Sequence, residues 1–296
     1  MFRRCRMNSS VSIVTVAYNS SHIVNGALSP FSGKYEIICV DNASSDDLDA
    51  ALADLDVRII KNLENIGFGR ACNQGLAAAS SEFVLFINPD VRVDERTIPA
   101  LLAAARMYAD SGVFLPLTIR EDGSLWVRNV PAGSGSRGRI REDVNRIAGD
   151  FCSQFLDGSI FLFRRSLFEE IGGFDENIFL YYEDDDLSRR LMEKKSAIIV
   201  VSDAYAKHAA GRSVSGGLIA EVHRNKYKKI SEIYYLRKHN LKYIVALDAA
   251  NHVMKIVFYT IVLDFFRLSG AFGRFMGIAS SVFRRSRRPA GGESFG

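Results

Sequence analysis

Four consecutive carboxylates, Glu183 to Asp186, follow an aromatic run and begin a segment with helical periodicity. Asp185 and Asp186 each have an arginine four residues later, Arg189 and Arg190. Side chains at this spacing meet on a helix surface, so these two carboxylates can form structural ion pairs. Any chemistry in the segment is therefore expected from the first two carboxylates.

Asp184 has Leu187 and Ser188 at the corresponding positions, so it has no local cation. It lies near the positive end of the predicted helix dipole, which favours the ionised carboxylate. Such a group is suited to act as a general base. Glu183 likewise has no cation at the corresponding positions in the sequence, however, and its like charge would raise the pKa of Asp184. An acidic first turn on a solvated helix explains the segment equally well, so both interpretations stay open at this point.

The first hundred residues alternate between strand and helix signals. Apolar, β-branched runs cover Val11 to Ala17, Tyr35 to Val40, Val57 to Ile60 and Phe83 to Ile87, and segments rich in Ala, Leu and Asp separate them. This alternation predicts an α/β fold with a mostly parallel central sheet flanked by helices. Ligands bind such sheets beyond the carboxyl ends of the strands, so the residues that follow each strand are the candidates.

Polar residues follow the first two predicted strands. Ala17, Tyr18 and Asn19 end the first strand, and Asp41 and Asn42 follow the second. A carboxylate such as Asp41 is the acceptor that the imide N–H of a pyrimidine base requires. A turn and helix cap is the alternative explanation for Asp41 and Asn42.

The third strand leads into a glycine-containing segment, residues 62–75. Gly67 and Gly69 allow close backbone approach, but Cys72 occupies the place of the third glycine in the dinucleotide pattern GxGxxG. The segment also does not follow the first strand. These departures argue against a nicotinamide-dependent Rossmann enzyme.

The fourth strand ends in Asn88-Pro89-Asp90, which places Asp90 past the sheet edge. A carboxylate there can hold a hard divalent cation and leave coordination positions for a diphosphate and water. One carboxylate alone is a poor metal site, and a helix cap is the alternative role. His208, after a predicted closing strand, could complete the coordination shell, although a lone histidine is more often structural.

The next part of the chain predicts a helix over 96–109, an apolar strand over 113–116 and a polar stretch over 121–150. The Gly/Ser-rich run 131–138 within this stretch is expected to be a mobile loop, either an inert excursion or a lid. Strand character resumes over 155–163. Two short closing strands are expected over 197–201 and 204–207.

The C-terminal part is basic. Residues 222–296 contain 14 Lys and Arg against 4 Asp and Glu, so the rest of the chain is net acidic although the whole carries +4. The apolar region 244–283 lacks a charge-free stretch of about 20 residues, the length that spans a bilayer. Helices lying in the membrane interface fit it, with Arg284, Arg285, Arg287 and Arg288 available to anionic headgroups. A helical subdomain that packs on the core or on a second subunit is the alternative.

Length and composition fit one catalytic-sized domain with an appendage, because 296 residues with 48% hydrophobic and 24% charged content are ordinary for a globular protein. The expected parts are an N-terminal tail 1–10, a domain 11–220, a basic amphipathic helical extension 221–283 and a disordered basic tail 284–296. Four scattered cysteines without a CxxC pair predict reduced, cytoplasmic thiols. The arginines before Val11 lead into a buried strand, not a signal peptide.

Seven motifs then occur in the order and approximate spacing found in family 2 glycosyltransferases, and the chain most resembles their bacterial rhamnosyltransferase-like branch. The motifs are Thr15-Val-Ala-Tyr-Asn19, Val40-Asp-Asn-Ala-Ser-Ser-Asp46, Asn65-Ile-Gly-Phe-Gly69 with Asn73, Phe86-Ile-Asn-Pro-Asp90, Gly172-Gly-Phe-Asp-Glu176, Tyr182-Glu-Asp-Asp-Asp-Leu187 and His208-Ala-Ala-Gly-Arg-Ser213. The resemblance covers about residues 11–240. Asn88-Pro89-Asp90 replaces a pair of aspartates, and Asp185 occupies a place that is commonly apolar.

The resemblance implies a GT-A fold and an inverting, metal-dependent transfer of rhamnose or a hexose in cell-surface polysaccharide synthesis. The implied partners are a dTDP- or UDP-sugar donor and a glycan or lipid-linked acceptor, and the implied cofactor is Mg²⁺ or Mn²⁺. Asp184 would be the base, and Asp90 with His208 would hold the metal. The implied donor-binding residues are Ala17, Tyr18, Asn19, Asp41, Asn42, Asn65, Gly67, Asn73, Asn88 and Asp90. Acceptor or sugar contacts are expected from Asp157, Phe174 and Glu183.

Two other functions remain as alternatives. A nucleotidyltransferase that forms nucleotide sugars would use similar elements, but no glycine-rich, basic loop follows the first strand to hold a triphosphate. A non-catalytic, membrane-associated protein that binds a sugar nucleotide is disfavoured because Asp90 and Asp184 are both present. The expected location is cytoplasmic and peripheral, on the inner face of the plasma membrane, with no nucleic-acid partner; an oligomer remains open.

Overall fold

The computed structural model describes residues 10–120, 123–125, 127–128, 130–133, 139–140, 148–208 and 217–286. Most of the loop expected over 121–150, the residues 209–213 after His208, and nearly all of the two expected tails lie outside these ranges. The chain forms two compact units. The first holds residues up to Glu176 together with Glu183–Ser215, and the second holds Asn177–Tyr182 together with the chain from Gly216.

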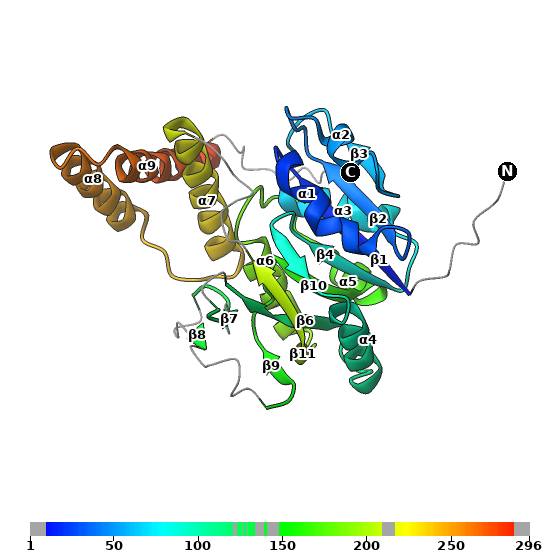
Figure 1. The fold of residues 1–296 in the computed structure, drawn as a ribbon. Coiled ribbons are helices and arrows are strands. Elements are labelled where there is room, and N and C mark those ends of the chain that lie inside the picture. The colour runs from blue at the N-terminus through cyan, green and yellow to red at the C-terminus, as the bar shows by residue number, and fades with distance from the viewer. Residues whose placement is uncertain are drawn as a thin grey trace. The chain divides into compact units, whose positions relative to one another are not determined.

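The first unit is built on one large sheet, drawn in Figure 1. Its strands are β1 (Val11–Ala17), β2 (Glu36–Asp41), β3 (Arg58–Lys61), β4 (Phe83–Ile87), β5 (Val91–Val93), β6 (Val113–Ile119), β9 (Phe151–Ser153), β10 (Ile160–Arg164) and β11 (Ile198–His208). The order is β3-β2-β1-β4-β10-β6-β11-β5, and β9 pairs with β11. The first four strands run parallel to one another, while β10 is antiparallel to β4 and β6. The predicted α/β architecture is confirmed. A separate short hairpin pairs β7 (Val127–Arg128) with β8 (Arg139–Ile140).

Helices cover both faces of this sheet. They are α1 (Ser21–Leu28), the short 3-10 helix η1 (Ser29–Phe31), α2 (Leu48–Leu52), α3 (Phe68–Ala78), α4 (Thr97–Met107), α5 (Arg165–Ile171) and α6 (Glu183–Glu193). Strand β4 shows why both faces are apolar, because Phe83, Leu85 and Ile87 pack in one core cluster and Val84 and Phe86 in the other. Alternate side chains of a strand point to opposite faces, so a sheet covered on both sides needs a continuous apolar run.

Two expected boundaries are wrong. The strand expected over 155–163 begins only at Ile160, because residues 157–159 form a turn in which Ser159 N donates to Asp157 Oδ1 at 2.9 Å. The two closing strands are one strand, β11, with a bulge between Val201 and Tyr205. The polar Ser202 stays in this strand because its backbone N–H donates to Asp150 Oδ1 at 2.8 Å.

The second unit consists mainly of three helices, α7 (Leu218–Lys238), α8 (Val245–Ile261) and α9 (Phe265–Ser286). Helix α9 packs on both α7 and α8. Gly273 allows its close approach to α7, because a Cβ there would lie 2.3 Å from the backbone oxygen of Val222. Among the described helices, none is both long and apolar enough to cross a bilayer.

Candidate active site

The turn after β4 and the end of β11 meet through strand pairing. Strand β5 follows the Asn88-Pro89-Asp90 turn and runs antiparallel to β11, which places His208 opposite Val91. As a result, Nε2 of His208 lies 3.4 Å from Oδ1 of Asp90, and the Asp90 side chain is 2% exposed. The structure therefore brings together the two residues that the sequence suggested as metal ligands.

The pKa of His208 is raised above its ordinary value. Burial lowers the pKa, but the hydrogen bond and charge of Asp90 and the charge of Asp157 raise it by more. The charge of Asp157 therefore acts on the imidazole as well. Three polar side chains from separate segments thus act on one another at this edge of the sheet.

Arg92, which the sequence analysis did not consider, holds the turn in place. Its guanidinium donates to the backbone oxygen of Pro89 at 2.8 Å, of Val91 at 2.9 Å and of Ile23 at 2.9 Å. Burial lowers the pKa of Arg92, while the charge of Asp90 raises it. The signal in the sequence was a cation two residues after a candidate metal ligand.

The short turn 157–159 connects the Asp90 region with Asp184. Ser159 accepts a hydrogen bond at 2.9 Å from the backbone N–H of Asn88. Asp157 Oδ1 is held by Ser159, and its buried Oδ2 has no hydrogen-bond partner among the described residues. A Cβ built on Gly158 would lie 3.4 Å from Cβ and 3.7 Å from Oδ2 of Asp184. Asp184 therefore borders the same turn as the Asp90 site.

Asp184 differs from its acidic neighbours in exposure. Glu183, Asp185 and Asp186 are buried, whereas Asp184 is half-buried. Asp184 lies in the first turn of α6, and its Oδ1 accepts the backbone N–H of Asp185 at 2.9 Å. The positive end of the helix dipole stabilises the ionised form of a carboxylate at this position. This carboxylate is the one of the four that a substrate hydroxyl can approach most readily.

The later carboxylates of the run have structural contacts. Asp186 pairs with Arg190 at 2.8 Å, as its spacing predicted. Asp185 accepts the backbone N–H of Ala132 at 2.5 Å, and Arg189 donates to the backbone oxygen of the same residue at 2.8 Å. These contacts fasten the described part of the Gly/Ser-rich loop to α6.

The strand ends β1 and β2 lie side by side. Ala17 pairs with Asp41 in the β1–β2 register, and the backbone N–H of Asn42 donates to the Ala17 oxygen at 2.8 Å. Asp41 Oδ1 accepts from Ser44 N at 2.9 Å, and none of the described residues donates to its Oδ2. Asn19 has a left-handed backbone with φ 52° and is fixed to the Ser44–Ser45 segment. Tyr18 beside it is 44% exposed.

Asn42 is the centre of an amide network that joins the second and third strand ends. Its Nδ2 donates to Asn65 Oδ1 at 2.9 Å and to the backbone oxygen of Gly67 at 3.3 Å. Its Oδ1 accepts from Asn62 Nδ2 and from the backbone N–H of Ile66, both at 3.1 Å. Gly67 has φ 94°, a conformation that favours glycine. Asn42, Asn65 and Gly67 therefore form one rigid edge.

Asn73 and Phe174 bind each other. Asn73 Nδ2 donates to the Phe174 oxygen at 3.0 Å, and Phe174 N donates to Asn73 Oδ1 at 2.9 Å. The ring of Phe174 is 1% exposed and packs against Phe86, Phe161 and Phe168. The ring therefore belongs to the core, and the acceptor or sugar contact expected of Phe174 stays a prediction.

Glu183 faces the interior beside α3. It is 8% exposed, and its Cβ lies 3.8 Å from a Cβ built on Gly69. Burial raises the pKa of the Cys72 thiol, and the charge of Glu183 raises it further. The acceptor contact expected of Glu183 stays a prediction.

In the described part of the chain, no three His, Cys, Asp or Glu side chains lie close enough to hold a metal ion by themselves. Asp90 and His208 would supply two ligands. The remaining positions around a cation would then have to come from a substrate or from water.

The largely parallel sheet with one antiparallel strand, β10, near its centre, and the acidic groups at the carboxyl ends of its strands, define a GT-A glycosyltransferase. The sequence model for glycosyl transferase family 2 matches residues 12–172, more than half of the chain. The chain belongs to this family, and it is a glycosyltransferase.

Similar proteins include rhamnosyltransferases. The chain is 28% identical over 262 residues to N-acetylglucosaminyl-diphospho-decaprenol L-rhamnosyltransferase of Mycobacterium tuberculosis, covering 75% of this chain and 84% of that protein. It is 24% identical to the dTDP-rhamnosyl transferase RfbF of Shigella flexneri, covering 87% and 89%. The mannosyltransferase PcManGT of Pyrobaculum calidifontis, solved with GDP-Man and Mn²⁺, shares the fold with a TM-score of 0.55 at 16% identity, covering 97% of this chain and 77% of that one.

Proposed function

We propose that the protein transfers rhamnose, or a hexose, from a pyrimidine nucleotide-diphosphate donor to a glycan or lipid-linked acceptor, with inversion at the anomeric carbon. The convergence of Asp90, His208, Asp157 and Asp184 on the turn 157–159 carries the proposal. It places a candidate base beside candidate ligands for a cation that would bind the donor diphosphate. The rhamnosyltransferases among its relatives favour rhamnose as the sugar.

The nucleoside would bind at the edge formed by β1, β2 and the Asn65–Gly67 segment. Oδ2 of Asp41 is the acceptor for the imide N–H of thymine or uracil, since Oδ1 is already used by Ser44. The exposed ring of Tyr18 is available to the base, and the Asn42 network keeps the edge rigid. A dTDP-sugar is the first candidate donor, as for RfbF, and a UDP-hexose the second.

A divalent cation fits the residues at the Asp90 end. Two buried polar atoms there, Oδ2 of Asp157 and Nδ1 of His208, have no hydrogen-bond partner among the described residues, and the buried carboxylate of Asp90 lies 3.4 Å from Nε2 of the same histidine. We propose that Asp90 and His208 hold Mg²⁺ or Mn²⁺, with diphosphate oxygens and water as further ligands. The ion would neutralise charge on the leaving diphosphate.

The chain's own residues perform the acid–base chemistry. The acceptor hydroxyl attacks the anomeric carbon from the face opposite the nucleotide, and Asp184 takes its proton. The bond from the anomeric carbon to the acceptor oxygen forms as the bond to the diphosphate oxygen breaks. One carboxylate suffices because a single displacement inverts the carbon and needs one proton acceptor.

The test is incubation of the full chain with dTDP-rhamnose or UDP-hexoses, Mn²⁺ and a polyprenyl-diphosphate-linked saccharide. Formation of a longer saccharide and release of nucleoside diphosphate are expected. Turnover of a sugar phosphate with release of pyrophosphate would establish the nucleotidyltransferase alternative instead. If the protein binds the donor but neither transfers the sugar nor slowly hydrolyses the donor, it is a non-catalytic protein.

We also propose peripheral contact with the inner face of the plasma membrane through the helical unit. Helix α8 has the reverse of the usual distribution of side chains on a surface helix. The polar side chains of Asp248, His252 and Tyr259 lie toward the neighbouring helices, while apolar side chains lie on the exposed face. The strongly exposed apolar side chains of this region include Leu247, Met254, Phe258, Ile261, Leu263 and Phe265. Apolar side chains beside basic ones are typical of an interfacial membrane contact.

The full chain with Met254→Ser and Phe258→Ser should bind vesicles containing anionic lipid less tightly than the wild type. Leu63→Ser, at an even more exposed leucine in the first unit, is the control and should bind as the wild type does. Equal binding by all three proteins would contradict the membrane contact and leave sugar transfer untouched.

A further inference from the structure

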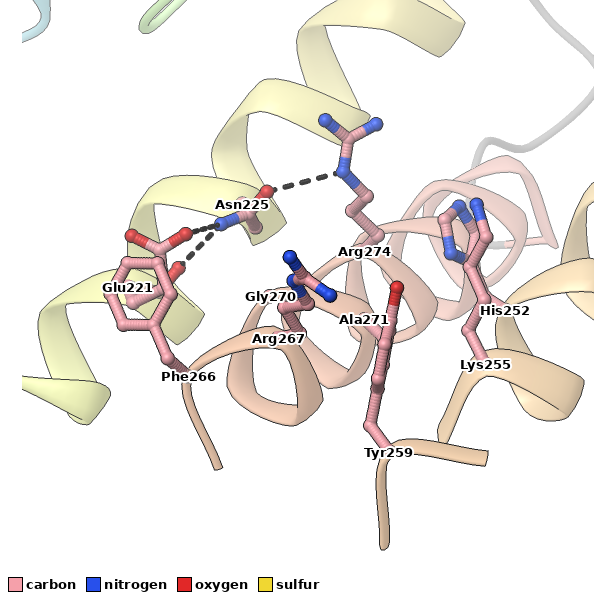
Figure 2. Close-up of a pocket in the computed structure, with 10 residues that line it drawn as sticks. All are labelled: Glu221, Asn225, His252, Lys255, Tyr259, Phe266, Arg267, Gly270, Ala271 and Arg274. Carbon is pink, nitrogen blue, oxygen red and sulfur yellow. Dashed lines mark hydrogen bonds between the residues drawn. The ribbon is translucent and has the colours of Figure 1, made fainter. Parts of the chain in front are cut away.

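A pocket of about 380 Å³ lies within the helical unit, formed by α7, α8 and α9 (Figure 2). It belongs to this unit alone and is separate from the candidate active site. Its lining residues are Glu221, Asn225, His252, Lys255, Tyr259, Phe266, Arg267, Gly270, Ala271 and Arg274. Gly270 leaves room on the α7 side, because a Cβ there would lie 3.5 Å from Asn225 Nδ2.

The pocket carries an excess of positive charge. Lys255 makes no ion pair or hydrogen bond with any residue that the structure describes. Arg267 has only an exposed contact with Asp264 at 3.5 Å, which contributes little. Arg274 donates through Nε to Asn225 Oδ1 at 3.1 Å, as Figure 2 shows, and its Nη1 lies 3.9 Å from Glu232 Oε2, so Nη2 remains for a ligand.

The carboxylate that lines the pocket is already balanced. Glu221 Oε1 accepts from Asn225 Nδ2 at 2.6 Å, and its Oε2 pairs with Arg224. Its charge is therefore matched within α7. The three cations from α8 and α9 are left to act on whatever enters the pocket.

His252 is a buried, incompletely satisfied side chain in the pocket wall. It is 3% exposed, its Nε2 lies 3.4 Å from Asp248 Oδ1, and its buried Nδ1 has no hydrogen-bond partner among the described residues. Burial lowers the pKa of His252, and the charges of Lys229, Lys255 and Arg274 lower it further. The charge of Asp248 raises this pKa, but by less than the other effects lower it. The side chains facing His252 from all three helices thus create a positive field with an open nitrogen inside it.

The surroundings of the pocket are apolar. Tyr259 and Phe266 belong to its lining, and the exposed Phe258, Ile261 and Phe265 lie next to them in the sequence of α8 and α9. A ligand with an anionic head and a long apolar chain matches both surfaces. A phosphomonoester suits the head best, because it carries a charge of about −1.5 to −2 and three acceptor oxygens against three cations.

We propose that this pocket binds the phosphate head of a membrane lipid, with the lipid chain lying on the exposed apolar residues of α8 and α9. The inference rests on the membrane contact proposed above and deepens it, because it assigns a specific headgroup site to what would otherwise be diffuse attraction. It does not depend on sugar transfer.

The test measures binding of the full chain to two vesicle types of matched surface charge. Both consist of phosphatidylcholine, one with phosphatidic acid and the other with phosphatidylserine. The wild type should bind the phosphatidic acid vesicles at least about tenfold more tightly, since a charge-assisted hydrogen bond is worth about 1.5–3 kcal/mol. Lys255→Gln, which removes an exposed side chain without a partner, should abolish this preference. Lys242→Gln removes the same charge from an exposed position outside the pocket and should keep the preference.

A second measurement separates a lipid headgroup from free phosphate. Titration of inorganic phosphate, followed by the NMR signal of His252, should raise the pKa of His252 in the wild type and not in Lys255→Gln. If phosphate raises the pKa of His252 but the protein binds both vesicle types equally, the pocket binds a soluble phosphate and the lipid proposal is overturned. Equal binding to both vesicle types, with no change in the pKa of His252, would overturn phosphate binding in the pocket and leave the general membrane contact intact. Failure to bind either vesicle would overturn both membrane proposals, while transfer to a soluble acceptor would be unaffected.

Discussion

Nε2 of His208 lies 3.4 Å from Oδ1 of Asp90, although the two residues are far apart in the sequence. The β5–β11 pairing, which sets His208 opposite Val91, produces this contact. The histidine that ends β11 thereby becomes a partner for the carboxylate after β4. The proposed cation site depends on this one strand pairing.

Asp90→Asn and His208→Gln should each weaken Mn²⁺-dependent donor binding. Loss of a residue that only orients a metal ligand costs about 10- to 100-fold in affinity, and loss of a ligand should cost no less. Calorimetric titration of dTDP-rhamnose with and without Mn²⁺ measures the effect. Asp203→Asn, at an exposed carboxylate on the same strand as His208, should bind as the wild type does. Unchanged Mn²⁺ dependence in Asp90→Asn would remove that residue from the site.

Arg92→Gln should disturb the Asn88-Pro89-Asp90 turn without touching the donor. The substitution leaves backbone oxygens of Pro89 and Ile23 without their donor, at a cost of about 1–3 kcal/mol in unfolding free energy. The KM for the donor should rise together with this loss of stability. The control Arg96→Gln changes a side chain that is 86% exposed and should leave both quantities unchanged. A variant of Arg92 with wild-type KM and stability would contradict the positioning role.

Asp248→Asn should destabilise the helical unit at neutral pH. Burial raises the pKa of Asp248, but hydrogen bonds from Lys229 and Tyr243 and the charges of Lys229 and His252 lower it by more. A carboxylate with a lowered folded-state pKa contributes stability that is present above its unfolded pKa of about 3.9 and is lost as the pH falls through the folded value.

The variant should therefore lose about 1–3 kcal/mol at pH 7, because the 2% exposed Lys229 loses a partner, and should approach the wild type below about pH 4. Urea unfolding at several pH values measures this. Asp110→Asn, at an exposed carboxylate, is the control. A difference that stays constant down to pH 3 would show that the ionised carboxylate is not the stabilising group.

The described cysteines should differ in reactivity. Burial, with a smaller contribution from Asp41, raises the pKa of Cys39 to about 12, and burial with the charge of Glu183 raises that of Cys72. Cys152 is exposed. In a Cys5→Ser background, a disulfide reagent should modify Cys152 rapidly in the native protein. Cys39 and Cys72 should react only on unfolding, because the thiolate is the reactive form. Rapid modification of three thiols would mean that the core around Cys39 and Cys72 opens readily.

The sequence predicted the parts of the fold that depend on local pattern. β1 and β4 occupy the predicted ranges, because a buried parallel strand is a continuous apolar run that composition alone reveals. The turn at 157–159 was missed because Phe155 and Leu156 extend the apolar run of β10 in sequence, although they lie outside the strand. The bulge in β11 depends on the Asp150–Ser202 contact, which no local pattern encodes.

For the candidate site, the sequence identified side chains at strand ends but not the residues that hold those side chains in place. Asp41 and Asp90 could be found because each follows an apolar strand, and Asp184 because it belongs to a run of four carboxylates. Phe174 was named only through the family resemblance, and the burial of its ring could not be predicted because a buried and an exposed aromatic look alike in sequence. Arg92 was overlooked because its acceptors are backbone oxygens, one of them in α1, and a backbone acceptor has no sequence signature.

The most direct test of the account is the transfer rate of Asp184→Asn, measured beside its affinity for the nucleotide-sugar donor. The substitution keeps the shape of the side chain but removes the proton acceptor, so kcat should fall by about 10²- to 10⁴-fold while the donor Kd stays close to that of the wild type. Transfer by Asp184→Asn at the wild-type rate would show that another group takes the proton, and the proposed base would have to be abandoned.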